Sequence, residues 1–185
     1  MDLKEYILPV NSMIGGWYIP PIICDDLISL FKQNEEYHKP GVVGPPVRVD
    51  PAQKVSTEIP MNPYYNHPTA MLYKNHIEKI IHLYEKKYPE IQQFQKFGMG
   101  EAYQIQYYKP GEGFKQWHFE RSSRKENRCL VFMTYLNDVP DGGTHFKYQE
   151  LTTPAEKGLT LIWPTDFSHT HKGQITDKHE KYIIT

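Results

Sequence analysis

Residues 102–108, which read AYQIQYY, decide the class of fold. Successive side chains of an extended chain point to opposite faces, so Tyr103, Ile105 and Tyr107 share one face of a predicted strand. Before this stretch the apolar residues recur with the helical period of about 3.6, and within it the period is 2. The chain therefore divides into a helical front and a β-rich back.

The β-rich back is predicted to be a series of short strands. Runs with strand character alternate with clusters of Gly, Pro, Asn and Asp, which form turns. Several short strands behind two packing helices predict an antiparallel sandwich or barrel with helical support. Besides 102–108, the expected strands are residues 116–120, 128–136, 144–148, 159–163 and 181–185, and the expected turns are residues 109–113, 137–143 and 154–158.

The front of the chain begins with a helix and continues into a stretch rich in proline. The first helix is expected over residues 21–36, with Asp25 or Asp26 as its cap. The proline-rich segment, residues 40–68, has too many prolines for a helix or a central strand. A loop of this length in a compact domain is typically functional or disordered.

A second helix is the clearest in the chain. Apolar side chains recur at helical spacing after Thr69, which we expect to cap the helix, and the helix should end near residues 88–89. A short helix is expected to follow as far as Phe97, closed by Gly98.

Composition excludes several classes of protein. With 185 residues the chain is expected to form one domain, and 21 basic against 22 acidic side chains give no electrostatic reason for a nucleic-acid partner. No apolar run reaches the ~18–20 residues of a membrane helix, and residues 1–5 do not begin a signal peptide. Cys24 and Cys129 are interpreted as reduced core residues, which indicates a cytoplasmic protein.

The chemistry is expected at residues 118–120, His-Phe-Glu. In a strand the imidazole of His118 and the carboxylate of Glu120 would point to the same face. With one more histidine, such a pair forms the facial triad of non-haem iron(II) oxygenases. By itself His-x-Glu is weak evidence, because a solvated strand face also carries such residues. The candidates for the third ligand are His169, His171 and His179.

Five motifs in order resemble the prolyl 4-hydroxylase-like branch of the 2-oxoglutarate/iron(II)-dependent oxygenases. Four of them are continuous runs, and the fifth is the ten-residue spacing from His171 to Lys181. That spacing favours His171 over His169 as the third ligand. The four runs are YKPGEGFKQWHFE at residues 108–120, CLVFMTYLNDV at 129–139, DGGTHF at 141–146 and KGLTLIWP at 157–164.

The resemblance implies a fold. It predicts an α+β, mainly β protein with a double-stranded β-helix core, also called a jelly-roll or cupin-like core. Residues 1–100 would supply helical support and the proline-rich segment, residues 101–185 would form the catalytic core, and residues 1–185 would be a single domain.

The resemblance also implies roles for individual residues. His118, Glu120 and His171 would hold iron(II), and Lys181 would pair with the far carboxylate of 2-oxoglutarate. Two further residues are expected at the cosubstrate, with core packing as the alternative for both: Tyr135 and Tyr108. Phe146 and Trp163 are interpreted as packing residues.

The implied activity is oxidative decarboxylation of 2-oxoglutarate to succinate and CO2, coupled to hydroxylation of a substrate. Iron(II), 2-oxoglutarate and O2 are the expected cofactor and cosubstrates, and ascorbate is a further candidate. The first substrate to consider is a proline in a protein or peptide, and a free amino acid or another small molecule is the alternative. No nucleic acid and no membrane are expected as partners.

Two other classes of function stay open on the sequence. The first is a cupin-type metalloprotein that uses no keto acid. This class would not explain the ten-residue spacing from His171 to Lys181. The second is a catalytically inactive module that binds a peptide in a tyrosine-rich groove. This class would not explain why His118, Glu120 and His171 are all present.

The sequence departs from the family pattern in two places. The carboxylate after His118 is Glu120, where the common motif has Asp, and the longer side chain must be accommodated. The last strand, residues 181–185, is shorter than in relatives, so we expect it to be marginally held.

The proline-rich segment is a candidate lid, because reactive intermediates must be shielded from water. In that hypothesis Arg48 and Lys54 meet the substrate, while Tyr64 and Tyr65 hinge or pack the return. In the alternative the segment wraps the edge of the sheet, and the substrate contacts lie around Arg121 and Arg124.

Overall fold

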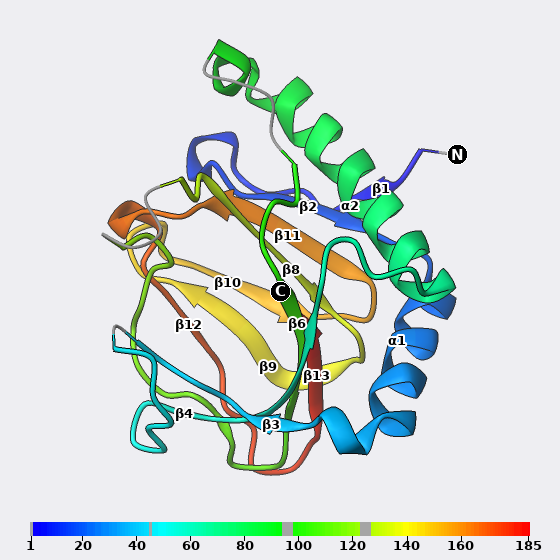
Figure 1. Ribbon diagram of the computed structural model, residues 1–185. Coiled ribbons are helices and arrows are strands. Elements are labelled where there is room, and N and C mark those ends of the chain that lie inside the picture. Colours follow the sequence, from blue (N-terminus) through cyan, green and yellow to red (C-terminus); the bar gives the residue numbers. More distant parts are fainter. Residues whose placement is uncertain (1, 45, 94–97, 123–126) are drawn as a thin grey trace.

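The computed structural model describes residues 2–44, 46–93, 98–122 and 127–185. Two antiparallel sheets face each other (Figure 1) and form the expected double-stranded β-helix. The larger sheet has the order β1 (Lys4–Glu5), β2 (Gly15–Tyr18), β11 (Leu159–Pro164), β8 (Leu130–Tyr135), β13 (Lys181–Ile184), β6 (Tyr103–Tyr108), β5 (Thr57–Met61) and β3 (Lys39–Pro40). The smaller sheet has the order β10 (Leu151–Ala155), β9 (Val139–Phe146) and β12 (His171–Gly173).

A further pair of short strands, β4 (Lys54–Val55) and β7 (Gly113–Phe114), forms a two-stranded sheet of its own. This pair links the proline-rich segment to the chain just before His118, and it bears on the site described below.

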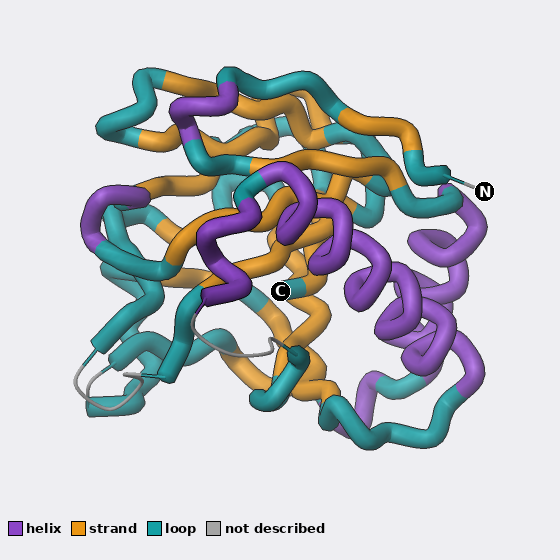
Figure 2. Tube along the Cα trace, turned by 90° about the horizontal axis from the view of Figure 1, so that it is seen from above, coloured by secondary structure: helices purple, strands orange, loops and turns teal. Residues whose placement is uncertain are grey.

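Two α-helices cover one face of the larger sheet, as Figure 2 shows from above. They are α1 (Pro21–Gln33) and α2 (Pro68–Lys87), and the short 3-10 helices are Val10–Ser12, Glu35–Tyr37, Pro89–Gln93 and Phe167–His169. Buried residues of both helices, such as Leu27 and Ile77, share a core with Ile105 and Ile184 from the sheet. The expected helical support is therefore confirmed.

A second core fills the space between the two sheets. It contains Tyr108, Tyr135, Phe146, Trp163 and Ile183, all buried. Strand alternation explains the division, because Ile183 points into this inner core while its neighbours in β13 face the helices. The prediction that Phe146 and Trp163 are packing residues is confirmed.

Both helices begin differently from the prediction. Helix α1 starts at Pro21, so Asp25 and Asp26 lie within it and do not cap it. Helix α2 starts at Pro68, so Thr69 does not cap it. No side chain makes a capping hydrogen bond at the start of either helix. Proline suits the first helical position, since its missing N–H would have no partner there and its φ is already helical. The short helix expected up to Phe97 is a 3-10 turn over Pro89–Gln93, and residues 94–97 lie outside the described residues.

Several strand predictions need correction. Residues 116–120 are not a strand, and only an isolated bridge joins His118 to His171. The turn expected at 137–143 belongs largely to β9, and β10 and β12 were not predicted. Strand β13 is not marginally held, because it is buried and pairs with β6 on one side and β8 on the other.

The proline-rich segment contains strand β5, although the sequence analysis excluded a central strand there. Strand β5 pairs with β6 along its whole length, whereas the two-residue β3 reaches only Thr57 and Glu58. Pro60 therefore lies where β5 has one neighbour, which is where a sheet tolerates proline. In residues 57–61 the segment extends the larger sheet, as in the alternative to the lid hypothesis.

The two cysteines differ from each other. Cys24 is buried, as predicted, but Cys129 is exposed, so the interpretation of Cys129 as a core residue is wrong. Within the described ranges neither helix combines the length and apolar character that a membrane span requires.

Candidate metal and cosubstrate site

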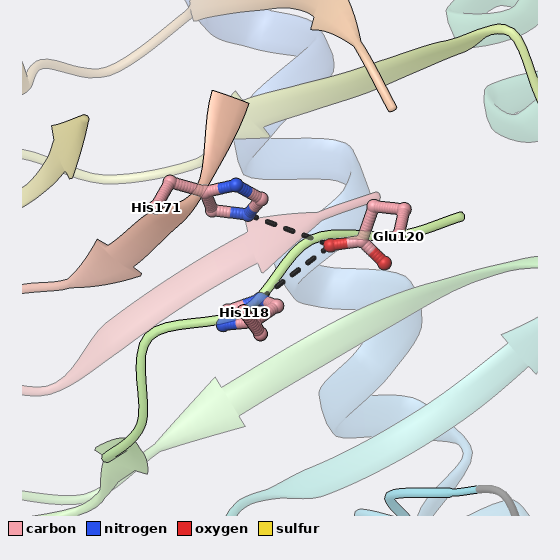
Figure 3. Close-up of side chains that lie close together, drawn as sticks. All are labelled: His118, Glu120 and His171. Atoms are coloured by element: carbon pink, nitrogen blue, oxygen red, sulfur yellow. Dashed lines mark ion pairs between the residues drawn. The ribbon is translucent and has the colours of Figure 1, made fainter. Parts of the chain in front are cut away.

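His118, Glu120 and His171 lie together at one end of the space between the sheets. Each offers one ligand atom, and these atoms lie within 4.8 Å of one another. The Nε2 atoms of both histidines are 3.4 Å from Oε1 of Glu120 (Figure 3). Among the described residues no other group of three such side chains converges in this way.

The backbone holds the three residues in place although His118 and Glu120 are outside regular strands. His118 and His171 exchange two backbone hydrogen bonds of 3.0 and 2.9 Å. The backbone N–H of Glu120 donates to the carbonyl of Thr165 at 3.1 Å, just after β11. Local strand geometry therefore does not bring the ligands together; contacts with distant segments do.

Both imidazoles are oriented by their second nitrogen. Nδ1 of His118 lies 3.0 Å from the carbonyl oxygen of Gln116, and Nδ1 of His171 lies 2.9 Å from that of His169. A carbonyl can only accept, so each Nδ1 donates its hydrogen and each Nε2 is the ring atom that faces Glu120. Metal-binding histidines in proteins are held in the same way.

The electrostatics favour a charged carboxylate in this cluster. Burial alone would raise the pKa of Glu120, but its contacts with His118 and His171 outweigh burial and hold this pKa well below its ordinary value. The second carboxylate oxygen lies 3.9 Å from the guanidinium of Arg128, which also makes two hydrogen bonds to Glu101. The ionised form is the one that a metal ion needs as a ligand.

The structure distinguishes between the three histidines proposed as third ligand. Nε2 of His169 is 3.0 Å from the carbonyl of Ser12 and so is already engaged away from the cluster. Burial lowers the pKa of His169, which keeps it neutral. His179 is exposed and is not among the converging residues. Only His171 can complete the set.

Aromatic side chains from the core surround His171. Its ring is 5.0 Å from that of Trp163, edge to face, and 5.8 Å from that of Phe146. The indole N–H of Trp163 has no acceptor within the part of the chain that the structure describes, although the side chain is buried. An unpaired buried donor is rare, and a ligand or water in this space would give it an acceptor.

Lys181 is the second notable group of the inner core. The side chain is only 6% exposed, and Nζ donates to the carbonyls of Gly142 at 3.2 Å and Gln174 at 2.7 Å. No acidic side chain of the described residues pairs with it, and burial lowers its pKa to about 8. A buried cation without an anion is costly, so the site suits a carboxylate that arrives with a ligand.

The two tyrosines predicted at the cosubstrate line this same interior. Tyr108 lies opposite Lys181 in the β6–β13 pair, and Nζ of Lys181 is 5.3 Å from its ring centre. The Tyr108 hydroxyl donates to Oε1 of Gln106, so its proton is already used. The Tyr135 hydroxyl is 2.6 Å from Oγ1 of Thr144, and burial raises its pKa to about 12, which keeps it protonated.

Some residues of the site escaped the sequence reasoning. Gln106 could have been found, because it alternates with Tyr108 on the inner face of β6. Phe114, whose ring stacks on His118, and Glu58, which is buried beside β6, carry no local signal. Of the residues proposed to meet substrate, Lys54 is buried in an ion pair, Arg121 faces Asp166 at 3.6 Å, and Arg124 lies outside the described residues.

Comparison with known proteins assigns the site to a class. Residues 103–185 match the family model of the 2OG-Fe(II) oxygenase superfamily. A search among curated proteins found no match. By the family match, residues 103–185 belong to the 2OG-Fe(II) oxygenase superfamily, which implies iron(II), 2-oxoglutarate and O2.

Solved structures with the same fold are prolyl hydroxylases. One from Pseudomonas putida, a prolyl-4-hydroxylase, is 11% identical with a TM-score of 0.70, over 95% of this chain and 93% of that one. The viral collagen prolyl hydroxylase of Paramecium Bursaria Chlorella virus-1 is 17% identical with a TM-score of 0.69, over 93% of each chain. A Trichoplax adhaerens prolyl hydroxylase, solved with a peptide fragment, is 13% identical with a TM-score of 0.69, over 95% and 84%. Residues 103–185 thus match the 2OG-Fe(II) oxygenase superfamily, and the chain as a whole has the fold of these prolyl hydroxylases.

Proposed function

We propose that the protein hydroxylates an aliphatic carbon of its substrate and couples this step to oxidative decarboxylation of 2-oxoglutarate. One atom of O2 enters the hydroxyl group and the other enters succinate, with release of CO2. The observation that carries the proposal is the convergence of His118, Glu120 and His171 in the same interior as Lys181, which has no acidic partner among the described residues.

The donor set is chemically suited to iron(II). Two imidazole nitrogens and one carboxylate oxygen leave three positions of an octahedral ion open. In the proposal His118, Glu120 and His171 would hold the ion, which when bound would offer positions for chelation by the keto acid and for activation of O2. The chain's own part is to orient both imidazoles through Nδ1 and to keep Glu120 ionised.

In the cosubstrate pocket Lys181 would pair with the far carboxylate. The carbonyls of Gly142 and Gln174 already fix the direction of its ammonium group. Tyr135 can accept a hydrogen bond from Thr144 and donate its own proton to the same carboxylate. Tyr108 has no free proton, so it would contribute its ring as the wall beneath Lys181.

The substrate class that we propose is a prolyl residue in a protein or peptide. The support is the fold, which the solved prolyl hydroxylases share, one of them solved with a peptide fragment. Mass spectrometry after incubation with iron(II), 2-oxoglutarate, ascorbate and proline-containing peptides should show the gain of one oxygen atom, matched by succinate. Oxygen gain on free amino acids or small acids but on no peptide would contradict this substrate class.

An anaerobic titration tests the keto-acid chemistry itself. Adding 2-oxoglutarate to the iron(II)-loaded protein should produce a weak visible charge-transfer band, because the keto acid would chelate the metal. A metalloprotein of cupin type without a keto-acid cosubstrate would bind iron(II) but show no band. An inactive peptide-binding module would show neither metal binding nor a band.

The pKa of Lys181 gives a pH prediction. Because its pKa is about 8 in the empty pocket, Lys181 is charged below about pH 8 and neutral above it. Affinity for 2-oxoglutarate should be constant at lower pH and fall by up to about tenfold per unit above pH 8. Calorimetric titration of the manganese(II)-loaded protein at several pH values measures this.

Lys181→Arg is the matched variant for the pH series, since an arginine stays charged throughout. Its affinity for 2-oxoglutarate should not fall between about pH 7 and about pH 9. If the wild type and Lys181→Arg lost affinity for 2-oxoglutarate equally at high pH, a group other than Lys181 would cause the loss.

A further inference from the structure

The imidazole rings of His118 and His171 pack against different parts of the structure. His171 begins β12, and its ring is surrounded by Phe146 and Trp163, which belong to β9 and β11 of the two main sheets. His118 lies outside the strands, and the ring that stacks on it is Phe114, at a centroid distance of 3.7 Å and an interplanar angle of 10°. The backbone of His118 is held by His171, but the face of its imidazole packs on Phe114, so the packing of this ring depends on what holds Phe114.

Phe114 belongs to β7, and in the described ranges β7 pairs only with β4 of the proline-rich segment. Phe114 lies opposite Lys54 in this pair. The next residue, Lys115, donates from its backbone N–H to the carbonyl of Gln53 at 2.7 Å and from Nζ to that of Pro51 at 2.9 Å. The strand that carries Phe114 is thus attached to residues 51–55.

Residues 51–55 are in turn linked to the larger sheet by a buried ion pair. Nζ of Lys54 lies 2.5 Å from Oε1 of Glu58, and each side chain is only 5% exposed. Glu58 stands in β5 opposite Gln106 of β6, so it is part of the main sheet. Nζ of Lys54 also lies 5.7 Å from the ring centre of Phe114.

The chain closes tightly over this pair. Oε1 of Glu58 also accepts a hydrogen bond from Ser56 at 2.8 Å. A Cβ atom at Gly41 would lie 2.0 Å from Oγ of Ser56 and 2.8 Å from Oε1 of Glu58, so only glycine allows this approach. Both charged groups are therefore almost fully removed from solvent, and each depends on the other.

We propose that the Lys54–Glu58 pair is a positioning element for the metal site: it ties β4 to the main sheet, and β4 places Phe114 against the imidazole of His118. The inference rests on the proposed metal-binding role of His118. In this proposal the proline-rich segment positions His118 and does not act as a lid. Removing one member of a buried pair leaves an uncompensated charge, whereas replacing both by apolar residues is often tolerated.

Cobalt(II) titration of the full chain tests the proposal, with visible absorption as a second readout of ligand geometry. Lys54→Met should weaken cobalt(II) binding about tenfold, the lower end of the loss seen when outer contacts of a metal ligand are removed. Phe114→Ala should weaken it similarly, and both should change the cobalt(II) spectrum. Combining the two substitutions should add little further, because both act through the same stacking contact.

Two other variants serve as comparisons. Lys74→Met removes a cation from a pair with the same i,i+4 spacing, but the side chains of Lys74 and Glu78 on α2 are 29% and 50% exposed, so cobalt(II) affinity should stay at the wild-type value. The double variant Lys54→Met/Glu58→Leu keeps an apolar contact between β4 and β5 and leaves no unpaired charge. It should recover most of the cobalt(II) affinity and the wild-type spectrum.

Distinct results would overturn the proposal. A Lys54→Met protein that is less stable yet binds cobalt(II) with wild-type affinity and spectrum would make the pair purely structural. If Lys54→Met fails to fold, Phe114→Ala decides alone, and unchanged cobalt(II) binding in that variant rejects the inference. Equal binding by wild type and His171→Ala would instead reject the proposed function.

Discussion

Replacing His171 with alanine is expected to abolish iron(II) binding and turnover. The remaining ligands, His118 and Glu120, hold only two positions on the ion, and a two-ligand site chelates too weakly. His118→Ala should have the same effect for the same reason. Calorimetric titration with iron(II) under anaerobic conditions measures the loss directly, and succinate formation measures turnover.

His169→Ala is the matched control for the loss of His171. His169 lies two residues away but is engaged with the carbonyl of Ser12, so its removal should leave iron(II) affinity intact. If His171→Ala bound iron(II) as well as the wild type, the distal ligand would be misassigned and His169 would become the candidate.

Replacing Lys181 with alanine is expected to remove most of the affinity for 2-oxoglutarate. The variant leaves a buried carboxylate of the cosubstrate without its cation, a loss of about 2–5 kcal/mol for a desolvated charge pair. The Michaelis constant for 2-oxoglutarate should rise steeply, while iron(II) affinity should not change because Lys181 is not a ligand.

Kinetics at saturating iron(II) and calorimetry with 2-oxoglutarate separate these effects. Tyr135→Phe, which removes one hydroxyl from the same pocket, should raise the Michaelis constant for 2-oxoglutarate less than Lys181→Ala does. An unchanged Michaelis constant in Lys181→Ala would contradict the cosubstrate role of Lys181.

The convergence of His118, Glu120 and His171 could be predicted from sequence better than the reason for it. His-x-Glu suggested a strand that aims both side chains to one face, but residues 116–120 form no strand. The side chains meet because the backbone of His118 bonds to that of His171, 53 positions away, and the backbone of Glu120 to that of Thr165, 45 positions away. Such contacts depend on tertiary structure, which a local pattern does not contain.

Glycines were the main source of error within the fold. Gly142 and Gly143 suggested a turn, yet both lie in β9. A Cβ atom at Gly143 would fall 1.7 Å from the carbonyl oxygen of Thr153 in β10, so the glycine marks a close approach between strands. Sequence alone cannot distinguish these uses of glycine, whereas the long amphipathic α2 was recognisable because its periodicity extends over many residues.

The central place of β13 has a consequence for how the molecule folds. Without this strand the larger sheet would consist of two separate parts, one ending at β8 and the other at β6. Until β13 pairs, β8 and β6 each present an open edge, and an open strand edge can pair wrongly. The strand that joins them also carries Lys181, so the same pairing that closes the sheet brings Lys181 to the proposed cosubstrate pocket.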